Sequence, residues 1–238
     1  NIRDHRKIMD IDNKVVFSGG MNLADEYINL RSPYGKWKDN CFKITGSAVS
    51  SYTLMFLQIW NAYEEDNEYE SFISQTYDSD TDNGYIMPFS DNPFDEYLVS
   101  KTIYMTILEN AKDYVYITTP YLLPDKDFEK LLCDTAARGV DVRLMYDGMG
   151  TQSAMPYRDD KKLNAEGIKT KVFNPFVPLV ATIQNNRDHR KILVIDGHTA
   201  FTGGVNIADE YINRKKRFGH WKDTAVMLKG EAVWNFTM

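Results

Sequence analysis

The apolar and polar positions along the chain predict alternating strands and helices. Short apolar runs bounded by turn residues predict strands at 7–11, 15–18, 41–44, 192–195, 199–202 and 225–228. Asp12-Asn13 and Asp196-Gly197 separate the paired runs, which is typical of tight hairpins. Apolar residues at helical spacing predict a helix over 48–62.

The middle of the chain alternates more regularly. Helical spacing predicts helices over 95–111, 127–138 and 159–166, and apolar runs predict strands over 114–118, 140–146 and 169–173. Gly139 and Gly167 follow two of these helices, where a glycine commonly ends a helix. This alternation favours an α/β fold with a parallel or mixed sheet flanked by helices.

An internal repeat organises the chain. Residues 1–49 align without a gap with residues 185–233, and 26 of the 49 positions are identical. The alternating region precedes only the second copy, and the chain ends inside the helix that would match 48–62. We therefore expect residues 1–66 to be the C-terminal part of a first, N-terminally truncated unit. Residues 95–238 are expected to form a second, C-terminally truncated unit, related to the first by a pseudo-twofold duplication.

An acidic segment lies between the two expected units. The formal net charge is −6, and residues 64–98 contain eleven acidic residues and no basic ones. We expect residues 67–94 to be a solvated acidic linker. An acidic total disfavours a nucleic-acid partner, since phosphate backbones are bound by excess Lys and Arg. The sequence has no apolar run long enough to span a membrane, and its two cysteines predict neither a disulfide framework nor a metal site.

Each copy carries the pattern H-x-K-x4-D-x6-G-G-x-N. Its residues are His5, Lys7, Asp12, Gly19, Gly20 and Asn22 in the first copy, and His189, Lys191, Asp196, Gly203, Gly204 and Asn206 in the second. A six-residue pattern that occurs twice in one chain is a specific signal.

The spacing of the pattern suits an anionic, tetrahedral substrate. Residues two apart on a strand share a face, so each histidine lies beside its lysine. An imidazole can attack phosphorus, while an ammonium and the Asn22 or Asn206 amide neutralise its oxygens. Gly20 and Gly204 allow the backbone to approach the ligand closely. Breaking and remaking a phosphodiester needs two imidazoles, one neutral nucleophile and one protonated acid, so the duplication is useful if the copies face each other.

The aspartates divide into two kinds. Asp12 and Asp196 belong to the motif but lie at the predicted turns, which favours a structural role. Asp39 and Asp223, in the W-K-D that precedes the last strand of each copy, are the candidates for orienting an imidazole. Asn22 and Asn206, each with an acidic residue three positions later, are also expected to be helix N-caps.

The duplicated motif resembles the signature of the phospholipase D superfamily. The segments RDHRKILVIDG, AFTGGVNIADEYIN, GHWKD, NAKDYVYITTPYLLPD and AARGVDVR are similar to bacterial cardiolipin synthases. This resemblance implies two α/β repeats sharing one site, a phosphohistidine intermediate, and neither metal nor cofactor. It implies that two phosphatidylglycerols are joined into cardiolipin and glycerol. The reaction is expected at the bacterial cell membrane, on a face accessible from the cytoplasm. The membrane anchor is expected to lie outside this stretch.

The resemblance also implies roles for individual residues. His5 and His189 correspond to the nucleophile and the acid, in an order left open, within catalytic motifs that include Lys7, Asp12, Lys191 and Asp196. Asn22 and Asn206 correspond to phosphate-binding residues. Both copies resemble the family's first motif. Two alternatives remain: a phospholipase D or nuclease, in which water takes the phosphoryl group, and an inactive fragment. The basic cluster Arg214–Arg217 is either a solvated loop or a contact for anionic lipid head groups.

Overall fold

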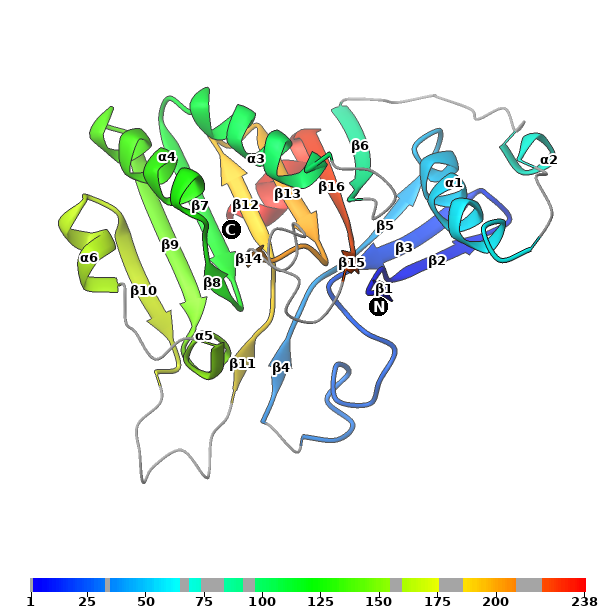
Figure 1. Cartoon of the computed structure of the whole chain (residues 1–238), viewed down its shortest axis with the longest axis horizontal. Coiled ribbons are helices and arrows are strands. Elements are labelled where there is room, and N and C mark those ends of the chain that lie inside the picture. The colour runs from blue at the N-terminus through cyan, green and yellow to red at the C-terminus, as the bar shows by residue number, and fades with distance from the viewer. Residues whose placement is uncertain are drawn as a thin grey trace.

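A computed structural model describes residues 2–32, 35–64, 69–73, 84–91, 97–154, 160–175, 186–208 and 220–238. Two sheets stand side by side in it, a large one formed mainly by the second unit and a small one formed by the first (Figure 1). The mixed α/β architecture expected from the sequence is therefore confirmed.

The large sheet has seven strands in the order β10-β9-β7-β12-β13-β16-β6. Strands β10, β9 and β7 are parallel, and the remaining neighbours are antiparallel. The bounds are β6 Gly84–Ser90, β7 Tyr114–Thr119, β9 Asp141–Asp147, β10 Lys169–Phe173, β12 Ile192–Ile195, β13 Thr199–Gly203 and β16 Thr224–Gly230.

Helices α3 (Val99–Glu109) and α4 (Lys126–Ala137) cover one face of this sheet (Figure 1). The Asp125 side chain accepts a hydrogen bond from the Phe128 amide at 2.8 Å, so it caps the first turn of α4. Leu108, Leu132 and Leu144 are fully buried between these helices and the strands. Burial of this apolar layer is the main stabilising contribution to the second unit. Short helices α5 (Gly148–Ala154) and α6 (Asp160–Ala165) follow β9.

The small sheet consists of β2 (Ile8–Ile11), β3 (Val15–Gly19) and β5 (Cys41–Thr45), with helix α1 (Val49–Trp60) packed against it. Its apolar side and that of the large sheet share one buried cluster, in which Val16 and Tyr52 lie with Val194 and Val226. The 3-10 helix η1 (Glu231–Val233) lies next to β16, and helix α7 (Trp234–Thr237) follows it and contacts β12. The two units therefore fold around a common core.

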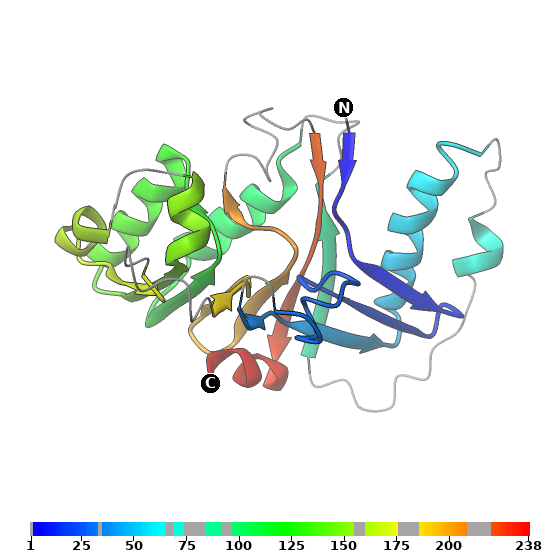
Figure 2. The ribbon, with the colours of Figure 1, turned by 90° about the horizontal axis from the view of Figure 1, so that it is seen from below.

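Short strands cross between the two copies. β1 (Ile2–Asp4) pairs in parallel with β15 (His220–Lys222), and β4 (Trp37–Lys38) pairs in parallel with β11 (Arg187–Asp188). One more backbone hydrogen bond extends each of these pairs to the motif histidine. The His5 amide donates to the Lys222 carbonyl and the His189 amide to the Lys38 carbonyl, both at 2.8 Å. Figure 2 shows the N-terminal strand β1 running alongside β15. The repeats are thus related by a pseudo-twofold exchange of strands.

Part of the segment expected to be an acidic linker forms regular secondary structure. Helix α2 (Glu70–Ile73) lies in it, and β6 is the edge strand of the large sheet, paired with β16. Phe89 of β6 is 5% exposed and packs edge-on against Tyr104 and Phe201. The linker interpretation is therefore wrong for residues 84–90, where an apolar run joins the core and Pro88 is tolerated at a sheet edge.

The expected helices after Asn22 and Asn206 are also absent from the described residues. Turns follow Asn22, with hydrogen bonds such as Tyr27 N to Ala24 O at 3.1 Å, and strand β14 (Ile207–Ala208) follows Asn206 and pairs with β8 (Leu122–Leu123). Leu23 is 94% exposed and Leu30 is 73% exposed. A short helix needs a packed apolar face, and the residues after Asn22 provide none, so the N-cap prediction is wrong there. At Asn206 the next two residues form a strand, which also contradicts an N-cap, and residues 209–219 lie outside the described residues.

Asp196 anchors the second hairpin to the start of β7. Its backbone has a φ of 51°, and its carboxylate accepts hydrogen bonds from the amides of Lys112, Asp113 and Tyr114 at 2.8–2.9 Å. Burial opposes its ionisation, but these amides outweigh that effect and lower the pKa of Asp196.

Replacing Asp196 with alanine should therefore lower the free energy of unfolding by about 1–3 kcal/mol, since three backbone donors lose their acceptor. Urea denaturation followed by circular dichroism measures the change. Asp134→Ala is the matched control, because that carboxylate is exposed and its ion pair with Lys130 one helical turn away contributes only about 0.5 kcal/mol. Equal losses in the two variants would contradict the anchoring role.

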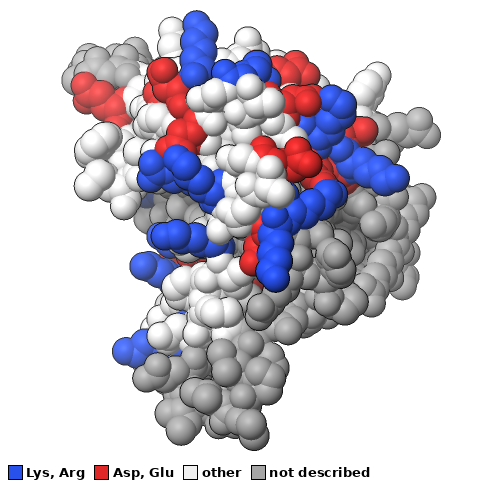
Figure 3. Space-filling view, turned by 90° about the vertical axis from the view of Figure 1, so that its left-hand side faces the viewer, with Lys and Arg blue, Asp and Glu red and all other residues white. Residues whose placement is uncertain are grey.

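The outer surface at the β10 end carries charges of both signs. Figure 3 shows Lys and Arg side chains interspersed with Asp and Glu on this face. Several of them pair, for example Lys162 with Glu129 and Lys169 with Asp141. In the part of the chain that the structure describes, no helix is both long enough and apolar enough to cross a membrane.

Candidate active site

Each motif histidine contacts the aspartate of the other copy. His5 Nδ1 lies 2.7 Å from Asp223 Oδ2, and His189 Nδ1 lies 2.6 Å from Asp39 Oδ2. Both carboxylates are buried, with exposed fractions of 1% and 0%. The hydrogen bonds that the orientation hypothesis requires are therefore present. With Nδ1–H directed at the carboxylate, Nε2 is the unprotonated nitrogen of each neutral ring.

A lysine lies against each imidazole. Lys7 Nζ is 2.6 Å from His5 Nδ1, and Lys191 Nζ is 2.7 Å from His189 Nδ1 and 3.3 Å from its Nε2. Each ammonium also donates to the carbonyl of its own histidine at 2.5 Å. Burial lowers the pKa of both lysines to about 8, with Asp39 and Asp223 opposing the shift. Both lysines remain largely charged at pH 7, as an anion-binding site requires.

The second glycine of each motif makes room for these carboxylates. A Cβ added at Gly20 would lie 2.5 Å from Asp39 Oδ1, and one added at Gly204 would overlap Asp223 Oδ1. These two positions therefore contact the orienting aspartate of their own copy. The close backbone approach predicted from the double glycine is made to a protein carboxylate in this structure.

The two motif asparagines differ in their contacts. The Asn22 side chain hydrogen-bonds Tyr27. Asn206 is 1% exposed, and within the described residues neither of its side-chain polar atoms has a hydrogen-bond partner. A buried amide without a partner is costly unless a ligand satisfies it. Asn206 is therefore the better placed of the two to donate to a bound oxyanion.

Aromatic side chains surround His189. Trp37, Tyr27 and Tyr121 have ring centroids 5.1, 5.9 and 6.2 Å from its imidazole, and the Arg187 guanidinium lies over Trp37 at 5.7 Å. Sequence reasoning missed Tyr27, Tyr121 and Arg187 as neighbours of the site. Trp37 was the one neighbour that the sequence could have indicated, because it belongs to the W-K-D segment that contains Asp39.

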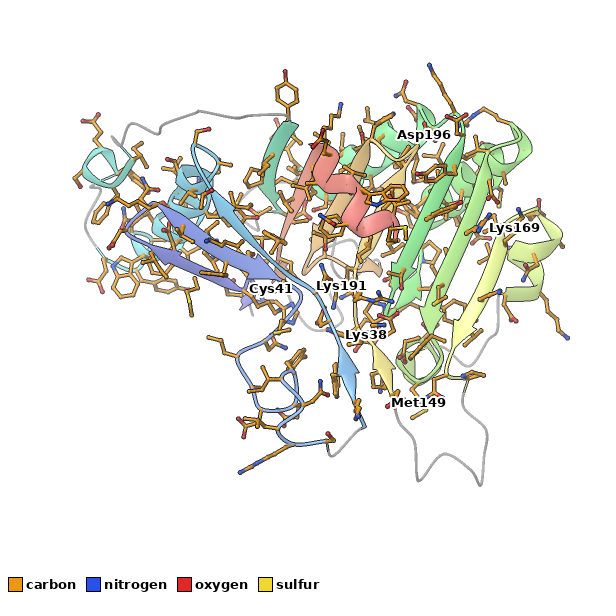
Figure 4. The ribbon with its side chains drawn as sticks, turned by 180° about the vertical axis from the view of Figure 1, so that it is seen from behind. Lys38, Cys41, Met149, Lys169, Lys191 and Asp196 are labelled. Atoms are coloured by element: carbon orange, nitrogen blue, oxygen red, sulfur yellow. The ribbon has the colours of Figure 1, made fainter. Side chains whose placement is uncertain are left out.

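Asp12 and Asp196 lie away from the imidazoles. Lys191 precedes β12 and Asp196 follows it, and Figure 4 shows the two at opposite ends of that strand. Asp12 lies in the matching turn after β2, with a φ of 56° and an exposed side chain. Both positions support the structural role favoured from the spacing. His198, outside the motifs, is exposed and bonds Thr199 Oγ1 at 2.8 Å.

Two further sequence expectations concern the rest of the site. Residues 209–219, which include the basic cluster, and the side chain of His220 lie outside the described residues. Among the residues that are described, no group of three or more His, Cys, Asp and Glu side chains could hold a metal ion.

Burial changes the titration of His189. Its pKa is lowered from 6.5 to about 4, first by burial and then by the Lys191 charge, while Asp39 opposes the shift. The unfolded chain therefore binds a proton between pH 6.5 and 4 that the folded chain does not. Because the unfolded state binds more protons in this window, stability falls as the pH falls through it.

We expect the free energy of unfolding to decrease by up to about 3 kcal/mol more in the unmodified chain than in His189→Gln when the pH is lowered from 6.5 to 4. Urea titrations at several pH values measure this difference. His198→Gln, at an exposed histidine outside the motifs, is the control. An unchanged slope in His189→Gln would show that His189 is protonated in the folded state.

Comparison with known proteins places these features in a family. A family model described as "Cardiolipin synthase, PLD-like domain" matches residues 104–224. An uncharacterized protein of Streptococcus mutans is 41% identical over 211 residues, 87% of this chain and 43% of that protein. A cardiolipin synthase of Alkalihalophilus pseudofirmus is 30% identical over 214 residues, 87% of this chain and 40% of that enzyme.

A solved structure shares the fold. The phosphatidylserine synthase of Haemophilus influenzae superposes with a TM-score of 0.65 at 11% identity, covering 96% of this chain and 58% of that one. The chain spans about two fifths of the length of the curated relatives that it matches. The match to the family model, which covers half of the residues, and the similarity to cardiolipin synthases show that this chain belongs to the cardiolipin synthase family of phospholipase-D-like domains.

Proposed function

We propose that this chain forms the centre of a phosphatidyltransferase that joins two phosphatidylglycerols into cardiolipin and releases glycerol. The family and the named activity of relatives such as the Alkalihalophilus cardiolipin synthase support the substrate class. The partner would be an anionic phospholipid at the surface of the bacterial cell membrane, on a face accessible from the cytoplasm. No metal or cofactor takes part in the proposed steps.

The observation that carries the proposal is the pair of crossed contacts, His5 with Asp223 and His189 with Asp39. Each contact uses one residue from each copy, so both imidazoles are held at the junction of the repeats. A double displacement on phosphorus needs two oriented imidazoles in one site. The crossed contacts support such a pair, and the lysine beside each imidazole would neutralise the phosphate oxygens.

The reaction would run in two balanced halves. One neutral imidazole attacks the phosphorus of the first phosphatidylglycerol, and the bond to glycerol breaks as the other, protonated imidazole supplies the leaving oxygen with its proton. The second phosphatidylglycerol then gives its hydroxyl proton to that same imidazole and attacks the phosphohistidine. The nitrogen–phosphorus bond breaks, and both imidazoles return to their starting states.

Hydrolysis is the second candidate. The His5 side chain is 25% exposed, so water can reach the imidazole on that side. Water in place of the second hydroxyl would yield phosphatidic acid. The first half of the reaction is common to both outcomes, and the acceptor alone separates them.

The experiment that tests the proposal incubates the 238-residue chain with phosphatidylglycerol in mixed micelles, with and without EDTA. Cardiolipin and glycerol in equal amounts, undiminished by EDTA, are the expected products by mass spectrometry. Phosphatidic acid alone would replace the transferase with the hydrolase. A folded chain without turnover would overturn both and support an inactive fragment.

A further inference from the structure

An arginine with unused hydrogen-bond donors lies beside the site, outside the H-x-K-x4-D motifs. Arg187, in β11, precedes His189 by two residues. Its side chain is 16% exposed, and its guanidinium lies over the Trp37 ring at 5.7 Å. The Trp37 ring in turn lies 5.1 Å from the His189 imidazole, so a single aromatic ring contacts both groups. Arg187 is therefore a cation next to the proposed reaction centre.

Asp147, at the end of β9, holds this guanidinium by one nitrogen only. Its buried carboxylate accepts hydrogen bonds from Arg187 Nε at 3.1 Å, from the Gly150 amide at 2.7 Å and from the Asp188 amide at 2.9 Å. Within the described residues, the two terminal nitrogens of Arg187 have no hydrogen-bond acceptor. Their N–H groups form a planar fork whose geometry matches a phosphate. The guanidinium is thus fixed in place with its fork unused.

The two arginines that directly follow the motif histidines are occupied differently. Arg6 and Arg190 each bond one carboxylate through both Nε and Nη2, at distances of 2.6–2.9 Å. The carboxylates of Asp4 and Asp188 therefore fill these forks. Of these three arginines, Arg187 is the one whose fork can bind an external anion.

A glycine leaves room beside this fork. A Cβ added at Gly150 would lie 3.2 Å from Arg187 Nη2 and 3.3 Å from Tyr121 Cε1. The Tyr121 ring centroid is 6.2 Å from that of His189. Burial raises the pKa of Tyr121, and the Arg187 charge opposes this shift. The positive charge therefore acts on a second ring that borders His189.

The proposed reaction brings two phosphates to this site. Lys7 and Lys191, which lie against the imidazoles, would neutralise the phosphate that reacts. The second phosphatidylglycerol carries a phosphate of its own, separated by the glycerol carbons from the hydroxyl that attacks. This second phosphate does not react, but its charge also needs a partner once it leaves bulk water. The motif residues supply one lysine to each imidazole and no further cation.

We propose that Arg187 binds this second, unreactive phosphate and so selects phosphatidylglycerol, in preference to water or a simple alcohol, as the acceptor. Asp147 is then a positioning residue, which fixes the guanidinium through Nε and leaves the fork for the ligand. The role of Arg187 rests on the function proposed above, and it is the same whichever imidazole carries the phosphoryl group.

The test lets two acceptors compete for one intermediate. The 238-residue chain is incubated with phosphatidylglycerol micelles and 1-butanol, which supplies a hydroxyl without a phosphate. Cardiolipin and phosphatidylbutanol are measured together by mass spectrometry. Arg187→Gln should lower the ratio of cardiolipin to phosphatidylbutanol by about 10- to 100-fold, the loss expected for hydrogen bonds to a charged group. Because both products come from the same intermediate, their ratio does not depend on the fraction of the chain that is folded.

Two further variants separate charge from geometry and site from surface. Arg187→Lys keeps the positive charge but loses the planar fork, so the ratio should fall less than in Arg187→Gln. Arg143→Gln is the matched control and should keep the ratio of the unmodified chain. Arg143 also bonds an aspartate, Asp141, at 2.8 Å and lies over the Tyr116 ring at 4.9 Å, but its side chain is exposed on β9.

The outcomes distinguish the role of Arg187 from the function on which it rests. An unchanged ratio in Arg187→Gln, whether or not the total amount of product falls, would overturn the role of Arg187 and leave the transferase intact. A larger fall in Arg187→Lys than in Arg187→Gln would also contradict an anion contact. If the folded, unmodified chain made neither product, or phosphatidylbutanol without cardiolipin, the proposed function itself would be overturned, and the role of Arg187 with it.

Discussion

Alanine in place of either His5 or His189 should reduce the formation of cardiolipin, or of phosphatidic acid, by about 10³-fold or more. In the proposed reaction each imidazole performs a different part of one proton and phosphoryl exchange, so losing either one should stop the cycle. The crossed contacts with Asp223 and Asp39 place both rings at the same junction. Initial rates with phosphatidylglycerol micelles measure the loss.

The double variant tests whether the two imidazoles act together in one site. Residues that act as a unit are not additive, so His5→Ala/His189→Ala should be no slower than the slower single variant. His198→Ala, whose side chain bonds Thr199 outside the motifs, serves as the control with unchanged rates. Near-normal turnover after the loss of either motif histidine would show that the two copies do not share one site.

Asparagine in place of Asp39 should lower kcat by about 10²–10⁴-fold with little change in KM. An asparagine can present either its oxygen or its NH2 group to Nδ1, so it no longer selects the Nδ1–H tautomer of His189, and it lacks the negative charge that favours the protonated ring. Asp223→Asn should act in the same way on His5. Steady-state rates measure the loss in each variant.

Because each imidazole pairs with the aspartate of the other copy, each asparagine variant should affect only one of the two rings. Proton NMR of the imidazole N–H groups should show that Asp39→Asn alters the His189 resonance and leaves that of His5 in place, and that Asp223→Asn does the reverse. Asp25→Asn is the matched control, because Asp25 is half exposed and pairs with Arg31 on the loop of the first copy. If Asp39→Asn altered the His5 resonance alone, the pairing would run within each copy.

The sequence predicted most of the secondary structure because local signals agreed with the final packing. The hairpins at Asp12 and Asp196, helix α4 and strands β7, β9 and β10 all follow from local periodicity and turn residues. Where packing overrides local signals, the predictions were wrong. The segment after Asn22 has the composition of a helix start but buries no apolar side, and β6 lies in an acidic window whose charge concealed its apolar run.

The site was predictable as a set of residues but not as a set of partners. The motif identified the imidazoles and lysines, and the W-K-D aspartates were the candidates for orienting them. Asp39 lies 34 residues from His5, and Asp223 lies 34 residues from His189, so proximity in sequence favours pairing within each copy. The observed pairing depends on the strand exchange of β1 with β15 and of β4 with β11, which no local pattern contains.

That exchange also determines when during folding the site forms. The crossed contacts join residues 218 and 150 positions apart, and closing such long loops costs chain entropy that only a docked structure recovers. The hairpins and the layer of α3 and α4 on the large sheet can form from nearer contacts. The imidazoles should therefore be brought together last, and the two- and three-residue strands that hold them should separate first under mild denaturant. The chain would then lose its chemistry while most of its hydrophobic core is still intact.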